Sequence, residues 1–448
     1  MKACVWKGPH DVRIEEVPEP SLINDTDAIM KVQTAAICGT DLHAYHGQVP
    51  GFESGIVMGH EFMGTVKQVG SKVSTIHAGD RVIASDITAC GSCWYCRQGL
   101  HWNCASRSLF GYGPAFGESL AGGQAEYVRI PHADTVLIPV PSDLADDRVL
   151  FLGDILSTGF LCALNGGVKP GDVVAVIGSG PVGVLTQMSA RVQGAAKVFA
   201  IDRLPDRLAM AEKFGSVPIN FEEQDPKTVV DAATQGRGAD VALEAVGGKE
   251  PLDSALRVVR PHGTVSIVGV HLEDNYPFSA IDGFVRELTV RFGVGDPMRL
   301  ASQILPLIEN EVIHPDKIIT HRLGLDDVPE GYRLFNDRKA FKVLVNVSWS
   351  FIEMIRQGGY RDASGVTGNG INSPLKWPPL FHCLRNSPAS GISSWCPNPE
   401  KNRPEAFLYY FRVTLISHWA PLLSQQSILC RDALKTMALS VAARRERA

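Results

Sequence analysis

The chain has 448 residues, too many for one hydrophobic core, and at a typical domain size of roughly 150 residues we expect two or three folded units. Hydrophobic residues make up 45% and charged residues 20% of the chain, as in ordinary globular proteins, and a net charge of -5 gives no reason to expect a nucleic acid partner. The first residues lack the apolar core of a secretory signal, so a cytoplasmic location is expected.

Short apolar runs broken by Gly and Pro characterise the chain up to about residue 150. No long helix is expected between them. This pattern is typical of an all-β unit, barrel-like or sandwich-like. The strands that we expect are AAICGTD (35–41), FMGTVKQVG (62–70), DRVIAS (80–85) and QAEYVRI (124–130).

From Lys169 onward the pattern changes to strands that alternate with helices. Continuous apolar runs such as DVVAVIG (172–178) and ADVALEAV (239–246) are separated by helix-length segments such as PVGVLTQMSARVQG (181–194). Such alternation predicts a parallel sheet with helices on both faces. A further helix and a final strand, FKVLVNV (341–347), follow this region.

The composition changes abruptly after Val347. Residues 349–448 hold four of the seven Trp residues, and residues 349–403 are rich in Gly, Ser, Pro and Asn around isolated Trp and Cys. We expect this extension to be poorly ordered, with one helix within residues 405–443. Its apolar run at 407–423 contains Arg412 and His418, which makes it a poor membrane span, and no membrane partner is expected.

A glycine-rich loop follows the first strand of the predicted parallel sheet and opens a helix. The first glycine permits a tight turn, the second lets backbone amides reach a pyrophosphate, and the third lets helix and strand pack closely. The helix N-terminus adds free N–H groups and partial positive charge. The loop therefore predicts a dinucleotide site made by Gly178, Gly180, Pro181, Val182 and Gly183.

An acidic residue, Asp202, ends the next apolar strand. Its carboxylate is placed to accept hydrogen bonds from the adenosine ribose and to repel a 2′-phosphate, which favours NAD over NADP. Arg203 directly follows and could pair with a 2′-phosphate, so NADP remains the less favoured alternative.

Four cysteines, Cys90, Cys93, Cys96 and Cys104, lie in one loop with the spacing C-x2-C-x2-C-x7-C. Four thiolates with short spacers can enclose one ion tetrahedrally and leave no open position, as in a structural zinc site. The competing iron–sulfur interpretation is weaker, because the ferredoxin run has a shorter last spacer and a Pro after its fourth Cys. We predict a structural zinc.

A second set of possible zinc ligands is dispersed along the chain: Cys38, His60, Glu61 and Asp154. A catalytic zinc site needs three protein ligands and one position for water or substrate. Their spacing alone does not bring these residues together.

The motifs ICGTDLH, GHEFMGTV, GSGPVG and GGQAEYVRIP, together with the four-Cys loop, resemble the zinc-containing medium-chain dehydrogenase/reductase family over about residues 1–347. GGQAEYVRIPHAD and LFLGDILSTG are most similar to its formaldehyde dehydrogenase-like branch. The resemblance implies an α/β protein with a GroES-like catalytic domain, residues 1–155 completed by 296–347. It also implies a Rossmann NAD-binding domain with a doubly wound sheet, residues 156–295, and a homodimer or homotetramer.

For the catalytic zinc, the resemblance implies that Cys38, His60 and Asp154 are the ligands and that Glu61 can ligate zinc when water leaves. Many alcohol dehydrogenases have Cys in place of Asp154, and Cys162 does not fill that motif position. With the four-Cys loop, two zinc ions per chain are expected.

The resemblance also implies a proton relay, in which Thr40 takes the substrate proton and His43 passes it to solvent through the cofactor ribose. It places Lys342 at the cofactor pyrophosphate and Arg207 beside the adenosine ribose. Zinc would lower the pKa of the alcohol before hydride leaves carbon for the nicotinamide.

The expected reaction is hydride transfer between an alcohol, or an aldehyde hydrate, and NAD. A polyol or threonine-type dehydrogenase with the same machinery is the alternative within enzymes. A non-catalytic NAD-binding protein is the alternative of another class, disfavoured because every zinc ligand is kept. Three aromatic residues that the sequence cannot rank are candidates for the substrate pocket: Phe110, Phe116 and Phe292.

Overall fold

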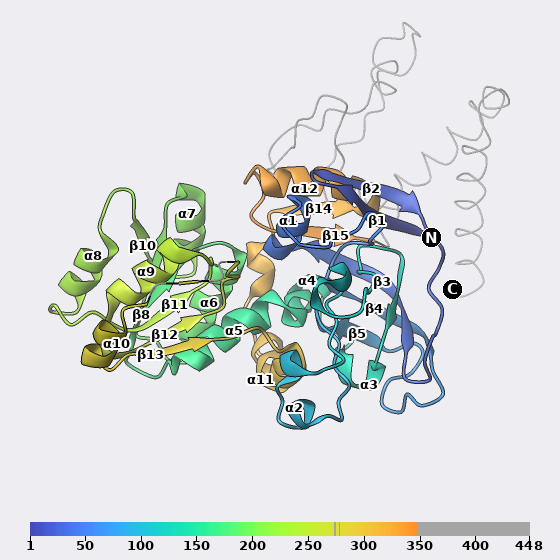
Figure 1. Cartoon of the computed structure of the whole chain (residues 1–448), viewed down its shortest axis with the longest axis horizontal. Coiled ribbons are helices and arrows are strands. Elements are labelled where there is room, and N and C mark those ends of the chain that lie inside the picture. Colours follow the sequence, from blue (N-terminus) through green and yellow to red (C-terminus); the bar gives the residue numbers. More distant parts are fainter. Residues whose placement is uncertain (273–274, 277, 348–448) are drawn as a thin grey trace, which may run out of the picture. The chain divides into compact units, whose positions relative to one another are not determined.

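The computed structural model describes residues 1–272, 275–276 and 278–347 (Figure 1). The predictions of a poorly ordered extension and of a helix within residues 405–443 lie outside these described residues.

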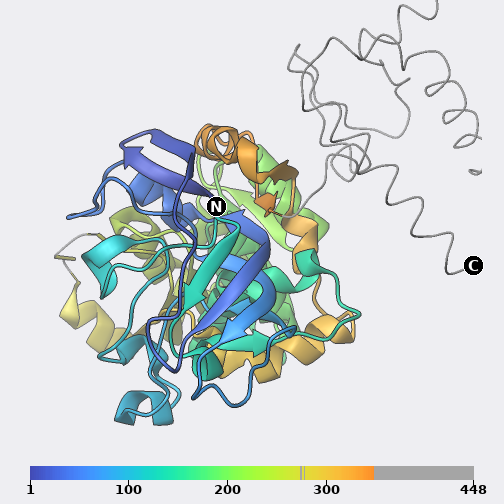
Figure 2. The same cartoon turned by 90° about the vertical axis from the view of Figure 1, so that its right-hand side faces the viewer.

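The β-rich part of the chain contains a two-stranded hairpin and one mostly antiparallel sheet of seven strands, whose blue and teal strands face the viewer in Figure 2. The sheet has the order β14-β15-β3-β4-β5-β7, with β6 also paired to β3. Its strands are β3 (Ala28–Ile37), β4 (Glu61–Val69), β5 (Arg81–Ala84), β6 (Tyr127–Ile130), β7 (Leu137–Pro139), β14 (His321–Gly324) and β15 (Val343–Asn346), and the hairpin is β1 (Lys2–Gly8) with β2 (Asp11–Glu16).

Helices in this part of the chain are mostly short. Buried side chains of β3, β4 and α12, among them Met30, Phe62 and Tyr332, belong to one hydrophobic core. The α-helices are α1 (Gly39–Tyr45), α2 (Trp94–Arg97), α3 (Ala133–Val136), α4 (Asp146–Val149), α11 (Pro297–Glu309) and α12 (Val328–Asn336), and the 3-10 segments are η1 (His101–Asn103), η2 (Gly113–Phe116), η3 (Leu150–Gly153), η4 (Pro315–Ile318) and η5 (Leu325–Asp327).

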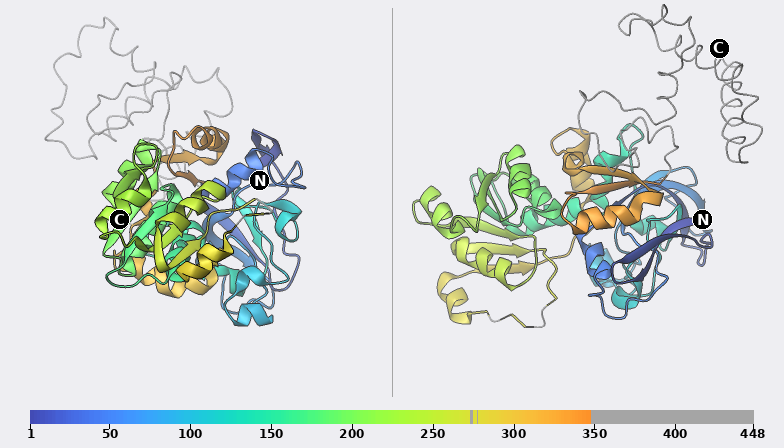
Figure 3. Two further views of the ribbon diagram at one scale, coloured as in Figure 1. Left: turned by 60° about the vertical axis from the view of Figure 1, so that its left-hand side comes forward. Right: turned by 90° about the horizontal axis from the view of Figure 1, so that it is seen from above.

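The middle of the chain forms a parallel sheet of six strands in the order β10-β9-β8-β11-β12-β13 (Figure 3). Its strands are β8 (Val173–Ile177), β9 (Lys197–Asp202), β10 (Val217–Asn220), β11 (Ala239–Glu244), β12 (Val259–Ile267) and β13 (Thr289–Phe292). Its helices are α5 (Ile155–Gly166), α6 (Pro181–Val192), α7 (Pro205–Lys213), α8 (Pro226–Ala233), α9 (Lys249–Val258) and α10 (Ala280–Arg286).

Both faces of this sheet are buried, as the continuous apolar strands predict. Alternate residues of β8 point to opposite faces. Ala175 and Ile177 belong to a core shared with α8 and α9, whereas Val174 and Val176 belong to a core shared with α5 and α6. The predicted α/β fold class with a doubly wound sheet is confirmed. Since β8 is flanked by β9 and β11, the strand order reverses at its carboxyl end, where such sheets bind ligands.

The first expected strand differs in position from the observed one. Strand β3 begins at Ala28 and ends at Ile37, and Cys38 is instead the residue that precedes helix α1. The Asp41 carboxylate accepts a hydrogen bond from the Cys38 N–H at 2.9 Å, and this capping interaction starts the helix.

Among the described residues, no single helix is both long and apolar enough to cross a membrane. Two consecutive segments, Asp146–Gly153 and Ile155–Gly166, reach that length and apolarity only together, with a bend of 57° between them. Most residues of the second segment are buried in the protein core.

We predict that a chain ending at Ser348 keeps its fold, zinc content and activity, because β15 is the last strand that the described sheets require. As the matched control, a chain ending at Ala340 lacks β15 and loses the buried side chains of Val343, Leu344 and Val345. Burial of each is worth about 1.5 to 3 kcal/mol, a large part of a total stability of roughly 5 to 15 kcal/mol. Soluble yield and thermal unfolding compare the two, and loss of fold in the longer chain would contradict the boundary.

Candidate active site

Three of the dispersed candidate ligands, Cys38, His60 and Asp154, meet in the structure. Their ligand atoms all lie within 4.8 Å of one another, and all three residues are largely buried. The antiparallel pairing of Ala36 with Glu61 places the end of β3 beside the start of β4, so Cys38 and His60 become neighbours. Asp154 enters from the junction of η3 and α5.

The spacing of these atoms suits a zinc ion. The Cys38 Sγ lies 3.5 Å and the His60 Nε2 lies 3.2 Å from Asp154 Oδ2. A tetrahedral zinc with bonds of 2.0 to 2.3 Å holds its ligand atoms about 3.3 to 3.8 Å apart. One thiolate, one imidazole and one carboxylate therefore fit zinc and leave a fourth position open.

Asp41 lies beside the His60 ring, and the sequence interpretation missed it. The fully buried Asp41 lies 3.1 Å from His60 Nδ1, which leaves Nε2 for a metal. Burial opposes the charged imidazole, but the Asp41 carboxylate, the Cys38 thiol and Asp154 together raise the pKa of His60 well above its usual value. The available signal was an acidic residue three positions after a candidate Cys ligand, which resembles an ordinary helix cap.

Glu61 does not join the three-ligand group. It is fully buried and its Oε2 binds the Lys342 ammonium, which also donates to the Ile37 carbonyl at 3.0 Å. Burial raises the pKa of Glu61 to about 7, although Lys342 opposes the rise. The family resemblance implies that Lys342 contacts the cofactor pyrophosphate, but here it is only 1% exposed and its ammonium group binds Glu61. Its position follows from the pairing of the next residue, Val343, with Ile37, which brings Lys342 into the interior.

Thr40 and His43 lie three residues apart on α1 and are both half-buried. Residues at this spacing share one helix face. The Thr40 carbonyl accepts the Tyr112 hydroxyl at 2.7 Å, and His43 Nδ1 lies 3.0 Å from Gln48 Oε1. Neither contact tests the implied proton relay, which stays a prediction.

The structure ranks the three aromatic candidates for the substrate pocket. The ring of Tyr112 lies 6.3 Å from His60, and Phe116 lies 5.5 Å from Tyr112, so Phe116 belongs to the aromatic group beside the ligands. Phe110 is fully buried against Phe62. Phe292 lies on β13 of the parallel sheet and is 65% exposed.

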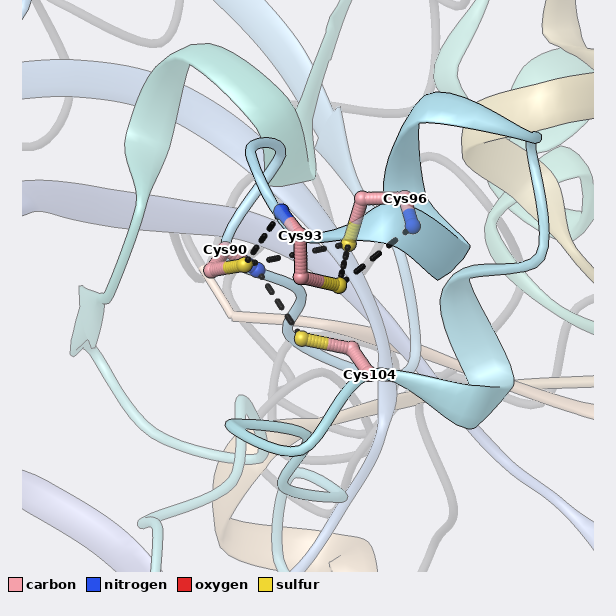
Figure 4. A group of neighbouring side chains, drawn as sticks. All are labelled: Cys90, Cys93, Cys96 and Cys104. Carbon is pink, nitrogen blue, oxygen red and sulfur yellow. Dashed lines mark hydrogen bonds between the residues drawn. The ribbon is translucent and has the colours of Figure 1, made fainter.

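The four cysteines of the second group turn their sulfur atoms toward one another (Figure 4). Cys96 Sγ lies 3.9 Å from Cys90 Sγ and 3.4 Å from Cys93 Sγ, near the roughly 3.8 Å separation expected around tetrahedral zinc. Main-chain N–H groups donate to these sulfurs and favour thiolates. Burial opposes ionisation, but hydrogen bonds from Ser92 and Cys93 lower the pKa of Cys90 to about 6.

The glycine-rich loop has the backbone that a dinucleotide site needs. Gly178 has φ of +92°, a backbone conformation in which any residue with a side chain would be strained. At Gly183 a Cβ atom would lie only 2.1 Å from the Gly178 carbonyl oxygen, so only glycine fits there. Gly180 precedes the first turn of α6, and a Cβ atom added there would lie 3.5 Å from its nearest neighbour, the Arg207 guanidinium. Pro181 and Val182 follow in the first turn of α6.

Asp202 lies at the carboxyl end of β9 and is 6% exposed. It accepts the N–H groups of Ser179 at 2.8 Å and Arg203 at 2.7 Å, which ties the glycine loop to β9. The Arg207 guanidinium lies 3.7 Å from the same carboxylate. The Arg203 side chain pairs with Glu222 at 3.5 Å.

Together, a parallel sheet with a dinucleotide loop and a thiolate, imidazole and carboxylate set define a zinc-binding dehydrogenase. Residues 24–142 match the alcohol dehydrogenase GroES-like domain, and residues 181–309 match the zinc-binding dehydrogenase domain. The chain belongs to the zinc-containing medium-chain dehydrogenase/reductase family.

Individual proteins agree with this assignment. The chain is 37% identical over 333 residues to a probable zinc-binding alcohol dehydrogenase of Mycobacterium tuberculosis, covering 74% of this chain and 84% of that protein. The solved alcohol dehydrogenase from Thermus sp. ATN1 is 42% identical, with a TM-score of 0.75 over 78% of this chain and 100% of that one. The 2R,3R-butanediol dehydrogenase from Bacillus subtilis is 28% identical, with a TM-score of 0.68 over 78% and 99%.

These comparisons support zinc and a nicotinamide cofactor for the chain. One similar solved structure is bound to NADP and another is complexed with NADH, so they do not choose between the two cofactors. They do not single out the formaldehyde dehydrogenase-like branch.

Proposed function

We propose that the protein is an NAD-linked alcohol dehydrogenase with a closed structural zinc and an open catalytic zinc in each chain. The observation that supports this most directly is the convergence of Cys38, His60 and Asp154 within 4.8 Å. The four cysteines would hold the structural ion with no free position. A non-catalytic NAD-binding protein would have no need of the three-ligand site.

The zinc, when bound at this site, supplies a Lewis acid that lowers the pKa of an alcohol. The chain's own residues set the geometry of the reaction. Asp41, 3.1 Å from His60 Nδ1, would fix the tautomer of His60. Thr40 and His43, which share one face of α1, would move the substrate proton toward solvent. NAD, when bound at the glycine-rich loop, would accept the hydride from the alcohol carbon, and the hydroxyl proton would leave through Thr40 and His43.

The proposed preference for NAD rests on Asp202 and its neighbours. A buried carboxylate at the end of β9 repels a 2′-phosphate. Arg203 is paired with Glu222, which reduces its capacity to bind that phosphate. Arg207 is left to flank the adenosine ribose.

The protein is further proposed to be a homodimer that associates through β13. This strand is the edge of the parallel sheet, and α10 beside it has no buried residue. Phe284 is 83% and Phe292 is 65% exposed. An apolar sheet edge is a pairing site for a second copy.

We predict that each active chain holds two zinc ions with different roles. Cys93→Ser should remove the structural ion and lower the unfolding temperature, because a closed site contributes folding energy. Asp154→Ala should abolish alcohol-dependent NADH formation while the fold is kept. Metal analysis, thermal unfolding and NADH absorbance separate these effects. As a control, Cys162→Ser lies outside both ligand groups and should keep two ions. A single zinc in active wild-type protein contradicts the two-site proposal.

We predict that Asp202→Ser raises activity with NADP relative to NAD by about tenfold, since the repulsion of a 2′-phosphate goes while Arg203 and Arg207 remain. The ratio of kcat/KM for the two cofactors measures the change. Asp206→Ser, on the first turn of α7, is the matched control and should leave the ratio unchanged. Wild-type protein that prefers NADP would overturn the assignment.

We predict that light scattering finds the mass of a dimer, or of a multiple of it, for the wild type. Phe284→Asp on α10 should shift the protein to monomer, because a charge there cannot be buried against a second copy. Val312→Asp changes a similarly exposed apolar side chain, 53% exposed, outside this surface, and should leave the mass unchanged. A monomeric wild type is incompatible with the proposed interface.

A further inference from the structure

Asp86 is a buried acidic residue near the catalytic ligands that the proposed reaction does not use. It follows β5 by two positions and is only 7% exposed. Its N–H donates to the Gly153 carbonyl at 3.0 Å, and its own carbonyl accepts the Phe110 N–H at 3.1 Å. The first contact fixes Asp86 beside the residue that precedes Asp154.

The Asp86 carboxyl group is poorly satisfied by the protein. Its Oδ1 accepts only the Ser85 hydroxyl, at 3.3 Å, and no donor among the described residues reaches Oδ2. Asp27 offers a partial comparison: its Oδ2 accepts the N–H of Asn24 and the guanidinium of Arg129, both at 3.0 Å, whereas its Oδ1 has no hydrogen-bond partner in the part of the chain that the structure describes. A mostly buried carboxyl group with one oxygen that receives no protein donor is available to bind a ligand at that oxygen.

A second acidic residue, Asp296, is bound by more protein groups than Asp86 is. Asp296, at the N-terminus of α11, accepts the His101 ring at 2.8 Å and the Arg299 N–H at 3.1 Å, so its carboxylate is held by the protein. Asp296 therefore caps the N-terminus of α11, whereas Asp86 Oδ2 makes no capping hydrogen bond within the described residues.

The charges around Asp86 favour its neutral form. Burial, then the negative charge of Asp154, raise the pKa of Asp86 well above its usual value, against the opposing effect of His60. Asp296 adds a smaller contribution in the same direction as Asp154. Whether ionised or neutral, a carboxyl group can accept a hydrogen bond from a substrate hydroxyl, so this contact does not depend on the protonation state of Asp86.

Apolar side chains also adjoin Asp86 along the chain. Ile87, directly after Asp86, forms a bridge with Leu109 and packs in a cluster with Tyr112 and Phe116. Tyr112 in turn faces His60. A few polar groups among apolar side chains are the usual arrangement by which a small-molecule pocket selects one orientation of its ligand.

Resting on the proposed function, we propose that Asp86 is a specificity-determining residue that binds a second hydroxyl group of the substrate. The substrate class is then a diol or polyol, with one hydroxyl oxidised at the metal ligands and another held by Asp86. A site built to hydrogen-bond a substrate hydroxyl discriminates strongly against the analogue that lacks it.

The test compares alcohols of one carbon skeleton: 1-butanol with 1,2-, 1,3- and 1,4-butanediol. In the zinc-loaded wild type, kcat/KM for the best diol exceeds that for 1-butanol by about tenfold or more, mainly through KM. Asp86→Leu removes this preference, and Asp86→Asn keeps much of it because an amide also donates and accepts. As a control, Ile87→Val shortens the neighbouring apolar side chain without changing polarity, and it should keep the ratio of kcat/KM for the diol to that for 1-butanol. Thermal unfolding and zinc content show that each variant is folded.

A binding measurement separates this inference from the proposed function. The fluorescence of the NADH complex reports diol binding without turnover, and the Asp86→Leu variant should weaken it about tenfold. If no alcohol is oxidised, the proposed function fails, while this binding comparison still tests Asp86. Equal preference for butanol and diols in the wild type, or an unchanged ratio in Asp86→Leu, overturns the inference. The wild type could instead prefer L-threonine over every diol, and Asp86→Leu could abolish that preference. This result would overturn the hydroxyl assignment in favour of an ammonium group.

Discussion

The pairing of β3 with its two neighbours is the constraint on which the catalytic centre depends. β4 brings His60 to Cys38, and β15 brings Lys342 to Glu61. Because all of these contacts come from one strand register, a slip of one residue would turn the ligands to the other face of the sheet. The register is specified by buried apolar side chains such as Met30 and Phe62. The core of the β-rich domain therefore also determines the geometry of the metal site.

The centre buries many ionisable groups close together, which is costly unless each is compensated. Asp41 is paired with His60, and Glu61 is paired with Lys342. A divalent cation among Cys38, His60 and Asp154 would compensate the remaining negative charge. Several kcal/mol of metal binding and folding are thus coupled here, as in other zinc proteins. Asp86 is not part of these pairs, and among the described residues no donor reaches its Oδ2.

Much of the fold was predictable from the sequence because its signals are local. The apolar runs of β8, β9 and β11 and the glycine-rich loop define the parallel sheet without knowledge of contacts. Strand β10 was missed, since it has four residues, includes Pro218 and exposes Val217. Strand β14 and helix α12, which lie between the further helix and the final strand, were likewise missed.

The site was predictable only in part. The four cysteines are close in sequence, so their spacing alone indicated a common ion. The roles of Asp41 and Asp86 and the partner of Lys342 depend on long-range register, which no local pattern contains. Cys38, His60 and Asp154 were grouped by family resemblance, and the structure then supplied the distances.

The central claim is that Cys38, His60 and Asp154 hold the zinc at which alcohol is oxidised. An anomalous difference map at the zinc edge, from crystals of protein with measured alcohol-dependent NAD reduction, tests this most directly. We predict one peak bonded to Cys38 Sγ, His60 Nε2 and an Asp154 oxygen, separate from a peak enclosed by the four cysteines. Active protein whose map has no peak among Cys38, His60 and Asp154 would contradict it.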